Sequence, residues 1–221
     1  MPLVFCEASY LRAGDGDWVL RPGHFAERHG LIIIVALGEV IVALGKAVVD
    51  RADGGGFETT SIIALASTGV FAGGLWWSYF DRFQPAMEHH AEGIEGRDRG
   101  RFALDAYTYA HLPIVAGVIL MAAALEEATL NPDQPIPLAL RMMLLAGIAT
   151  FVGGVSIGTY RAFRVLPGER LIGVAVLGAF VLLAGSVDGV WVIVIVDLVA
   201  LVGLLAEHAR IEVQPKRSPA N

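Results

Sequence analysis

Residues 31–49 read LIIIVALGEVIVALGKAVV and contain only two ionisable side chains, Glu39 and Lys46. A helix of about 20 apolar residues, rising about 1.5 Å per residue, crosses the roughly 30 Å hydrocarbon core of a bilayer. The stretch therefore predicts a membrane-spanning helix. The whole chain has the same character, because 55% of its 221 residues are hydrophobic and only 17% are charged. This composition excludes an ordinary soluble globular protein and indicates an integral membrane protein.

Five further apolar stretches of comparable length follow the first one. They cover residues 60–80, 102–125, 138–160, 171–185 and 189–206. Because only helices and closed barrels satisfy every backbone polar group in lipid, runs of this length predict spanning helices. We therefore expect an all-α fold, a polytopic membrane helix bundle of about six transmembrane helices. The fifth of the six stretches is the shortest, so we expect that helix to tilt little or to use flanking residues.

The distribution of basic residues predicts the orientation of these helices. Cytoplasmic segments of membrane proteins carry an excess of Lys and Arg. With six crossings, 13 of the 16 Lys and Arg residues fall on the side that holds both chain ends. We therefore expect both termini in the cytoplasm. Residues 1–23 then form a short cytoplasmic N-terminal leader, residues 24–208 the six-helix transmembrane domain, and residues 209–221 a polar cytoplasmic tail.

Composition and motifs exclude several classes of function. The net charge of −6 argues against a nucleic-acid partner, because such partners require dense basic surfaces. The chain lacks the nucleophile-elbow, phosphate-loop, zinc-protease and paired-cysteine motifs, so we expect no enzyme and no cofactor. The segment 88–92, EHHAE, has no defined spacing of metal ligands. We interpret this segment as a solvated loop and expect no metal site there.

Three ionisable side chains lie near the middle of predicted helices: Glu39, His111 and Asp197. A charged group at the centre of a bilayer costs at least about 2.5–3.5 kcal/mol of free energy, so we expect each of these residues to have a structural or functional role. They have similar depth and are candidates to meet inside the bundle. They form either a polar site for transport or proton relay, or hydrogen bonds between helices that only hold the bundle together.

The third predicted helix is the most irregular. Asp105, Tyr107 and His111 lie in its cytoplasmic half, and Pro113 follows. Pro113 lacks the N–H that would bind the Tyr109 carbonyl, so we expect a kink that frees this oxygen for an ion, a water or a hydroxyl. A neighbouring helix can equally satisfy the oxygen. His111 and Tyr107 are about one turn apart, and we expect them to form a hydrogen-bonded pair.

The first predicted helix carries its polar residues on one stripe. Arg28, Glu39 and Lys46 are separated by nearly whole helical turns, so their side chains share a face that we expect to contact protein or water. Lys46 lies near the outer end of the helix, where a long side chain extends its charge toward the membrane surface.

Glycine and aromatic positions predict how other helices pack. The Gly-x-x-x-Gly segments 69–73 and 154–158 place small residues one turn apart, which favours close crossings with neighbouring helices. Trp76, Trp77 and Tyr79 lie at the cytoplasmic end of the second predicted helix. We expect these rings in the headgroup layer, where amphipathic aromatic side chains are favoured.

Four segments resemble the bacterial low temperature requirement A family. They are HFAERHGL at residues 24–31 running into ALGE at 36–39, LWWSYFD at 75–81, AYTYAHLPIVAG at 106–117, and GTYRAFR at 158–164. The residues of these segments, their order and their spacing all match the family. The resemblance implies an all-helical integral protein of the bacterial inner membrane, from a family named for growth in the cold. Glu27 and Arg28, which lie in the first segment, also belong to the candidate polar site.

The chain departs from the family in length. Family members are typically nearly twice as long and begin with a helical half whose acidic and aromatic motif is absent from this sequence. The chain therefore resembles the C-terminal half alone. A half of this kind leaves an apolar, protein-facing surface uncovered, so we expect a homo-oligomer or a partner membrane subunit.

Two hypotheses of function follow. The first is a membrane protein, surrounded by lipids, that passes a small ion or small solute through the bundle. Its candidate intramembrane site comprises Glu39, His111, Asp197, Tyr107, Asp105, Glu27 and Arg28. The second is a non-transporting scaffold or stress-adaptation protein, active in the cold, whose buried polar groups are structural.

Overall fold

The computed structural model describes residues 22–54 and 56–213, so the expected leader lies almost wholly outside the described residues, as does the tail from residue 214. Within the described residues the chain is helical, without a strand. The elements in order are α2 (Pro22–Asp53), α3 (Thr59–Trp77), η1 (Ser78–Phe83), α4 (Gln84–Glu92), α5 (Gly96–Phe102), η2 (Ala103–Tyr109), α6 (Ala110–Leu130), α7 (Leu138–Phe163), α8 (Gly168–Leu183) and α9 (Gly189–Val213).

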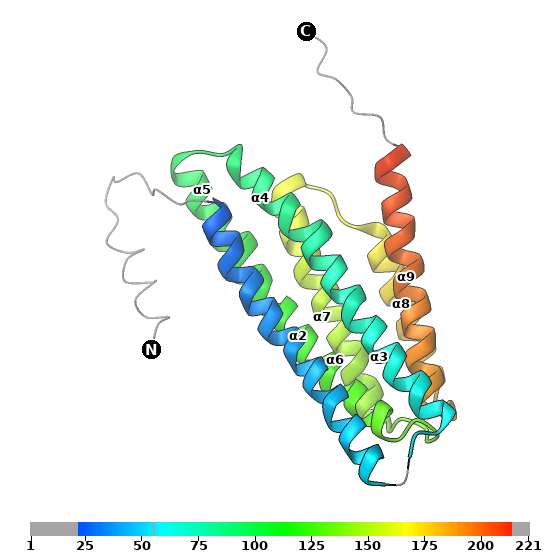
Figure 1. Cartoon of the computed structure of the whole chain (residues 1–221). Coiled ribbons are helices and arrows are strands. Elements are labelled where there is room, and N and C mark those ends of the chain that lie inside the picture. Colours follow the sequence, from blue (N-terminus) through cyan, green and yellow to red (C-terminus); the bar gives the residue numbers. More distant parts are fainter. Residues whose placement is uncertain (1–21, 55, 214–221) are drawn as a thin grey trace.

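The helices form one elongated bundle, which confirms the predicted all-α membrane fold (Figure 1). Five helical segments of the described chain are long and apolar enough to cross a membrane. The sixth, α8, has 16 residues and rises only about 24 Å at about 1.5 Å per residue. It is the helix that the sequence marks as shortest. The first described helix begins, and the last one ends, at the same end of the bundle (Figure 1).

Two of the spanning helices run further than the sequence indicates. The predicted helix at 60–80 continues through η1 and α4, and the one at 102–125 begins in α5 and passes through η2. Both η1 and η2 are π-helical, with hydrogen bonds from residue i to residue i+5. The interpretation of 88–92 as a loop is wrong, because these residues lie in α4. Helix α6 continues through Pro113, and the π-helical segment η2 lies directly before the turn that contains it.

The α6 helix is the centre of the bundle, since it contacts α2, α3, α7 and α9. Its tightest contact is with α7, where glycines let the two backbones meet. A Cβ atom added to Gly117 would lie 2.6 Å from the backbone nitrogen of Phe151. A Cβ atom on Gly154 would lie 2.7 Å from the carbonyl oxygen of Ala110. Small residues at these positions therefore set the distance between α6 and α7.

The two Gly-x-x-x-Gly predictions have different outcomes. Gly154 and Gly158 do pack closely, because a Cβ on Gly158 would lie 2.6 Å from the Phe83 ring. Gly69 and Gly73 do not, since no atom of the described chain lies within 4 Å of a Cβ built on either one. Spacing alone identifies a smooth helix face, and it does not show which neighbour covers that face.

Polar side chains link neighbouring helices at several depths. Nη1 of the buried Arg141 on α7 donates to the carbonyl oxygen of Val181, 2.8 Å away, near the last turn of α8. The hydroxyls of Thr68 on α3 and Thr129 on α6 are 2.8 Å apart and buried. Each bond satisfies groups that have no water partner in lipid, so each one stabilises the bundle.

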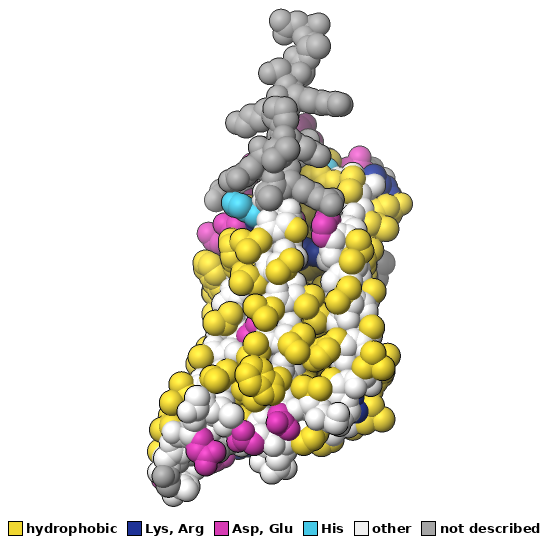
Figure 2. Space-filling view, turned by 90° about the vertical axis from the view of Figure 1, so that its right-hand side faces the viewer, with side chains coloured by type: hydrophobic (Ala, Val, Ile, Leu, Met, Phe, Trp, Pro, Cys, Tyr) yellow, Lys and Arg dark blue, Asp and Glu magenta, His cyan; other side chains and the backbone are white. Residues whose placement is uncertain are grey.

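The outer surface of the bundle is apolar. Figure 2 shows hydrophobic side chains over the middle of the face that it presents, with acidic side chains gathered mainly toward the two ends. Large apolar residues such as Val35, Leu183 and Val202 are exposed. A soluble monomer rarely exposes such a continuous apolar area, whereas contact with lipid requires it.

Candidate functional site

Four side chains that can donate and accept protons meet at one buried place in the bundle. His29 comes from α2, Tyr79 from η1, Tyr107 from η2 and His111 from the first turn of α6. The Oη atom of Tyr79 and Nε2 of His111 lie 2.6 Å apart in a buried hydrogen bond. Exposed fractions are 0% for Tyr79, 1% for Tyr107 and 3% for His111. We call these four residues the tyrosine–histidine cluster.

The rings of the cluster pack directly on one another. The Tyr107 ring stacks on the His111 ring at 5.7 Å and 12°. The His29 and His111 centroids are 4.9 Å apart. Phe25 and Phe83 close the sides, at 5.5 Å from Tyr107 and 5.7 Å from His111. The imidazole of His111 is therefore enclosed by aromatic rings.

The two π-helical segments position the tyrosines. A π-helical turn adds a residue to the normal α-helical spacing, which rotates the side chains that follow onto a different face. Tyr79 lies in η1 and Tyr107 in η2, so both phenols reach the cluster from distorted helices. Single π-turns of this kind occur often at functional sites.

Two polar atoms at or beside the cluster have no hydrogen-bond partner within the described part of the chain. They are the hydroxyl of Tyr107 and Oε1 of Gln84, which packs beside Gly30. A buried polar atom without a partner costs about 1–3 kcal/mol. Imidazole and phenol groups both donate and accept hydrogen bonds. The cluster can therefore bind a water or a small polar solute through hydrogen bonds, and a ring nitrogen can take up a proton.

His111 and Tyr107, both candidates from the sequence, thus belong to the cluster. The expected hydrogen bond between them is replaced by ring stacking, because the hydroxyl of Tyr79 takes Nε2 of His111. Asp105 lies in η2 and forms an ion pair with Arg161 of α7. This ion pair joins η2 to α7 and leaves Asp105 in a supporting position next to the cluster.

The other candidates on α2 lie elsewhere. Glu39 is exposed on the outer face of α2, as are Glu27 and Arg28. Arg28, Glu39 and Lys46, which the sequence places on one stripe, are all exposed. Lys46 is tied to Glu126 of α6 by an ion pair. The idea that Glu39 meets His111 inside the bundle is wrong for the described chain, since the apolar positions of α2 face inward instead.

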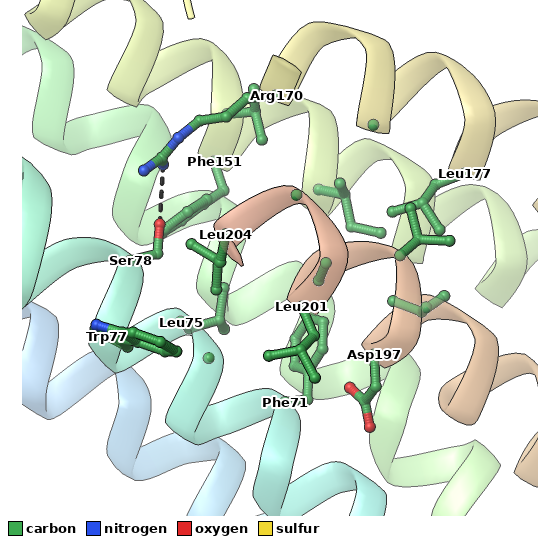
Figure 3. A pocket seen from close by; sticks show the side chains of 18 of the residues that line it. Phe71, Leu75, Trp77, Ser78, Phe151, Arg170, Leu177, Asp197, Leu201 and Leu204 are labelled. Atoms are coloured by element: carbon green, nitrogen blue, oxygen red, sulfur yellow. Dashed lines mark hydrogen bonds between the residues drawn. The ribbon is translucent and has the colours of Figure 1, made fainter. Parts of the chain in front are cut away.

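Asp197 lines a separate cavity of about 320 Å³ between α3, α7, α8 and α9. None of the four cluster residues lines this cavity. Figure 3 shows Asp197 near one end, and Arg170, bonded to the Ser78 hydroxyl, toward the other. The structure therefore places His111 and Tyr107 in one site, Asp197 in another, and the candidates on α2 in neither.

Sequence reasoning missed His29 and misplaced Tyr79. Tyr79 is fully buried, contrary to the expectation of a headgroup-layer ring, because η1 and α4 continue the helix beyond it. Trp76, by contrast, is exposed. The family resemblance is the sequence feature that points to the cluster. Each of its four residues lies in one of the segments that resemble the family: His29, Tyr79, Tyr107 and His111.

A bundle of apolar helices with a buried cluster of protonatable groups defines a polytopic helical membrane protein. The model of the bacterial low temperature requirement A protein family matches residues 2–205, and the chain belongs to this family. A protein of Rhizobium meliloti (strain 1021), described as uncharacterized, is 30% identical over 156 residues. That alignment covers 71% of this chain and 37% of the relative, so the chain corresponds to well under two thirds of the relative's length. No solved structure matches the chain.

Proposed function

We propose that this low temperature requirement A protein passes protons, or a small ion or solute accompanied by protons, through the tyrosine–histidine cluster. The observation that carries the proposal is the hydrogen bond between Tyr79 and His111, buried within two spanning segments. Protonatable groups inside a membrane mark ion pathways and proton relays. The two ring nitrogens of a neutral histidine can donate a hydrogen bond on one side and accept one on the other.

We place the protein in the bacterial inner membrane with both termini in the cytoplasm. The excess of basic residues on the side of the termini supports this orientation. With this orientation, η1, α4, α5 and η2 lie toward the cytoplasmic side, because they are near the end where α2 begins (Figure 1). The cluster then lies between the cytoplasm and the middle of the bilayer.

Association with a second copy, or with a partner membrane subunit, is part of the proposal. Glu39 is exposed among apolar neighbours such as Val35 and Val42 on the outer face of α2. A carboxyl group facing lipid at this depth is costly, and a protein partner removes that cost. No enzymatic step and no cofactor enters the proposal.

The test is a flux assay with the purified full chain in proteoliposomes that contain a trapped pH-sensitive dye. We compare wild type with Tyr79→Phe, which removes one hydroxyl from the cluster. Tyr109→Phe is the matched control, because Tyr109 is 55% exposed and outside the cluster. Applied gradients of H⁺, Na⁺ and K⁺ identify the coupled ion. Flux that is lost in Tyr79→Phe and kept in Tyr109→Phe supports the proposal.

The second candidate is the scaffold hypothesis, and close packing of polar groups favours it. Arg141 bonds to the end of α8, Asp105 pairs with Arg161, and the Tyr79–His111 bond joins η1 to α6 in the same manner. In this hypothesis wild-type protein shows no flux of any tested ion, while Tyr79→Phe still lowers stability.

A further inference from the structure

The cavity between α3, α7, α8 and α9 is large enough for a small organic molecule. Its volume is about 320 Å³, within the usual size of ligand sites, which begins near 300 Å³. Its walls are apolar along most of their length, with the side chains of Phe71, Leu75, Phe151 and Leu201 around it (Figure 3). The apolar walls favour a ligand with a hydrophobic body.

Three acidic residues line the cavity, Glu169, Asp197 and Glu207. Oδ1 of Asp197 is buried and has no hydrogen-bond partner within the described residues, and Asp197 forms no ion pair there. A carboxylate in apolar surroundings is strongly unfavourable without a counter-charge. The missing partner therefore has the chemistry of a cation or of a hydrogen-bond donor.

The basic group at the other end of the cavity is already neutralised. Nε of Arg170 donates to Glu207 at 3.1 Å, and its Nη1 donates to the hydroxyl of Ser78 at 2.9 Å. Both Arg170 and Glu207 line the cavity, so their opposite charges cancel there. Asp197 is consequently the lining carboxylate that lacks a partner among the residues described.

Aromatic rings reinforce the preference for positive charge. Phe71, Trp77 and Phe151 line the cavity, and the faces of such rings attract cations. We infer that this cavity binds a small hydrophobic organic monocation, with its charge at Asp197 and its apolar body against these rings. The site is separate from the tyrosine–histidine cluster, and the inference does not depend on the proposed passage.

The experiment measures equilibrium binding of tetraphenylphosphonium to the purified full chain in detergent. Tetraphenylborate, which has nearly the same shape and the opposite charge, reports binding that is only hydrophobic. Asp197→Asn keeps the shape of the side chain and removes its negative charge. We expect at least a tenfold weaker affinity for tetraphenylphosphonium in this variant and no weakening for tetraphenylborate.

A second pair of variants tests the cavity without changing charge. Gly173 lines the cavity, and nothing lies within 4 Å of a Cβ built on it, so Gly173→Leu fills the cavity without a backbone clash. Gly153 has the same free space and does not line the cavity, which makes Gly153→Leu the matched control. We expect tetraphenylphosphonium binding to weaken in Gly173→Leu and to stay unchanged in Gly153→Leu.

Three results overturn the inference: no binding of tetraphenylphosphonium by wild type, equal affinity in wild type and Asp197→Asn, or equal effects of the two leucine variants. Equal affinity in Asp197→Asn together with weakening in Gly173→Leu would show a cavity for neutral apolar molecules such as lipid chains. These binding results do not depend on whether the protein passes ions in the proteoliposome assay. Failure of the cation site is therefore distinguishable from failure of the proposed passage through the tyrosine–histidine cluster.

Discussion

The replacement of Tyr79 by phenylalanine gives the clearest test of how the cluster is built. It removes one hydroxyl that lies 2.6 Å from Nε2 of His111 and leaves the ring contacts in place. A net hydrogen bond contributes about 0.5–1.5 kcal/mol, and a buried polar atom left without a partner costs about 1–3 kcal/mol. Hydrogen bonds between membrane helices measure about 0.6 kcal/mol on average and reach about 1.7. We therefore expect Tyr79→Phe to lower the free energy of unfolding by about 1–2 kcal/mol.

The assay is reversible unfolding of the purified protein in mixed micelles as the fraction of denaturing detergent rises. A double-mutant cycle with His111→Asn isolates the energy shared by the pair, which we expect to be about 0.5–2 kcal/mol. Tyr109→Phe removes an exposed hydroxyl and should change stability by less than about 0.5 kcal/mol. If Tyr79→Phe behaves like Tyr109→Phe, or if the two cluster substitutions are additive, the pair is not energetically coupled and the reasoning is refuted.

Three further predictions concern the helices around the cluster. Gly117→Ala should destabilise the protein by about 1–3 kcal/mol, because overpacking forces α6 and α7 apart. Gly69→Ala should be nearly neutral, because its Cβ meets open space. Thermal unfolding compares the two variants, and equal effects would contradict the close contact between α6 and α7. Arg141→Met should lower the free energy of unfolding by about 1–3 kcal/mol, because it leaves the carbonyl of Val181 without its donor. Amide hydrogen exchange should then become faster at the end of α8. Unchanged exchange would argue against a stabilising role of the Arg141–Val181 bond. Glu39→Gln should leave the stability of the single chain unchanged, since the side chain is exposed. Native mass spectrometry of the wild type in mild detergent should show an assembly of more than one subunit. Detection of monomers alone would count against association.

The spanning helices could be predicted because length and hydropathy are local properties. The stretch 31–49 lies wholly inside α2, and the shortest predicted helix corresponds to α8, the shortest of the six membrane-depth helices in the described chain. The direction in which a side chain points was harder to predict. In the stretch 31–49 nearly every residue is apolar, so the pattern does not distinguish the face toward lipid from the face toward α6 or fix the direction of Glu39.

The cluster shows a second limit of sequence reasoning. His111 and Tyr107 could be singled out by their depth and by their position before Pro113. Tyr79 reaches the cluster from η1, a π-helical segment that neither propensity nor periodicity reveals. The helical spacing predicts a partner for His111 one turn away in its own helix, whereas the partner lies in η1.

We propose that His111 takes part in moving protons or ions across the membrane. The most direct measurement is the initial rate of dye response in proteoliposomes after an imposed pH step, for wild type, for His111→Asn and for liposomes without protein. The account predicts a wild-type rate well above that of empty liposomes and a rate for His111→Asn that falls to the empty-liposome level at equal protein content. A wild-type rate equal to that of empty liposomes for every imposed ion gradient, or an undiminished rate in His111→Asn, would contradict it.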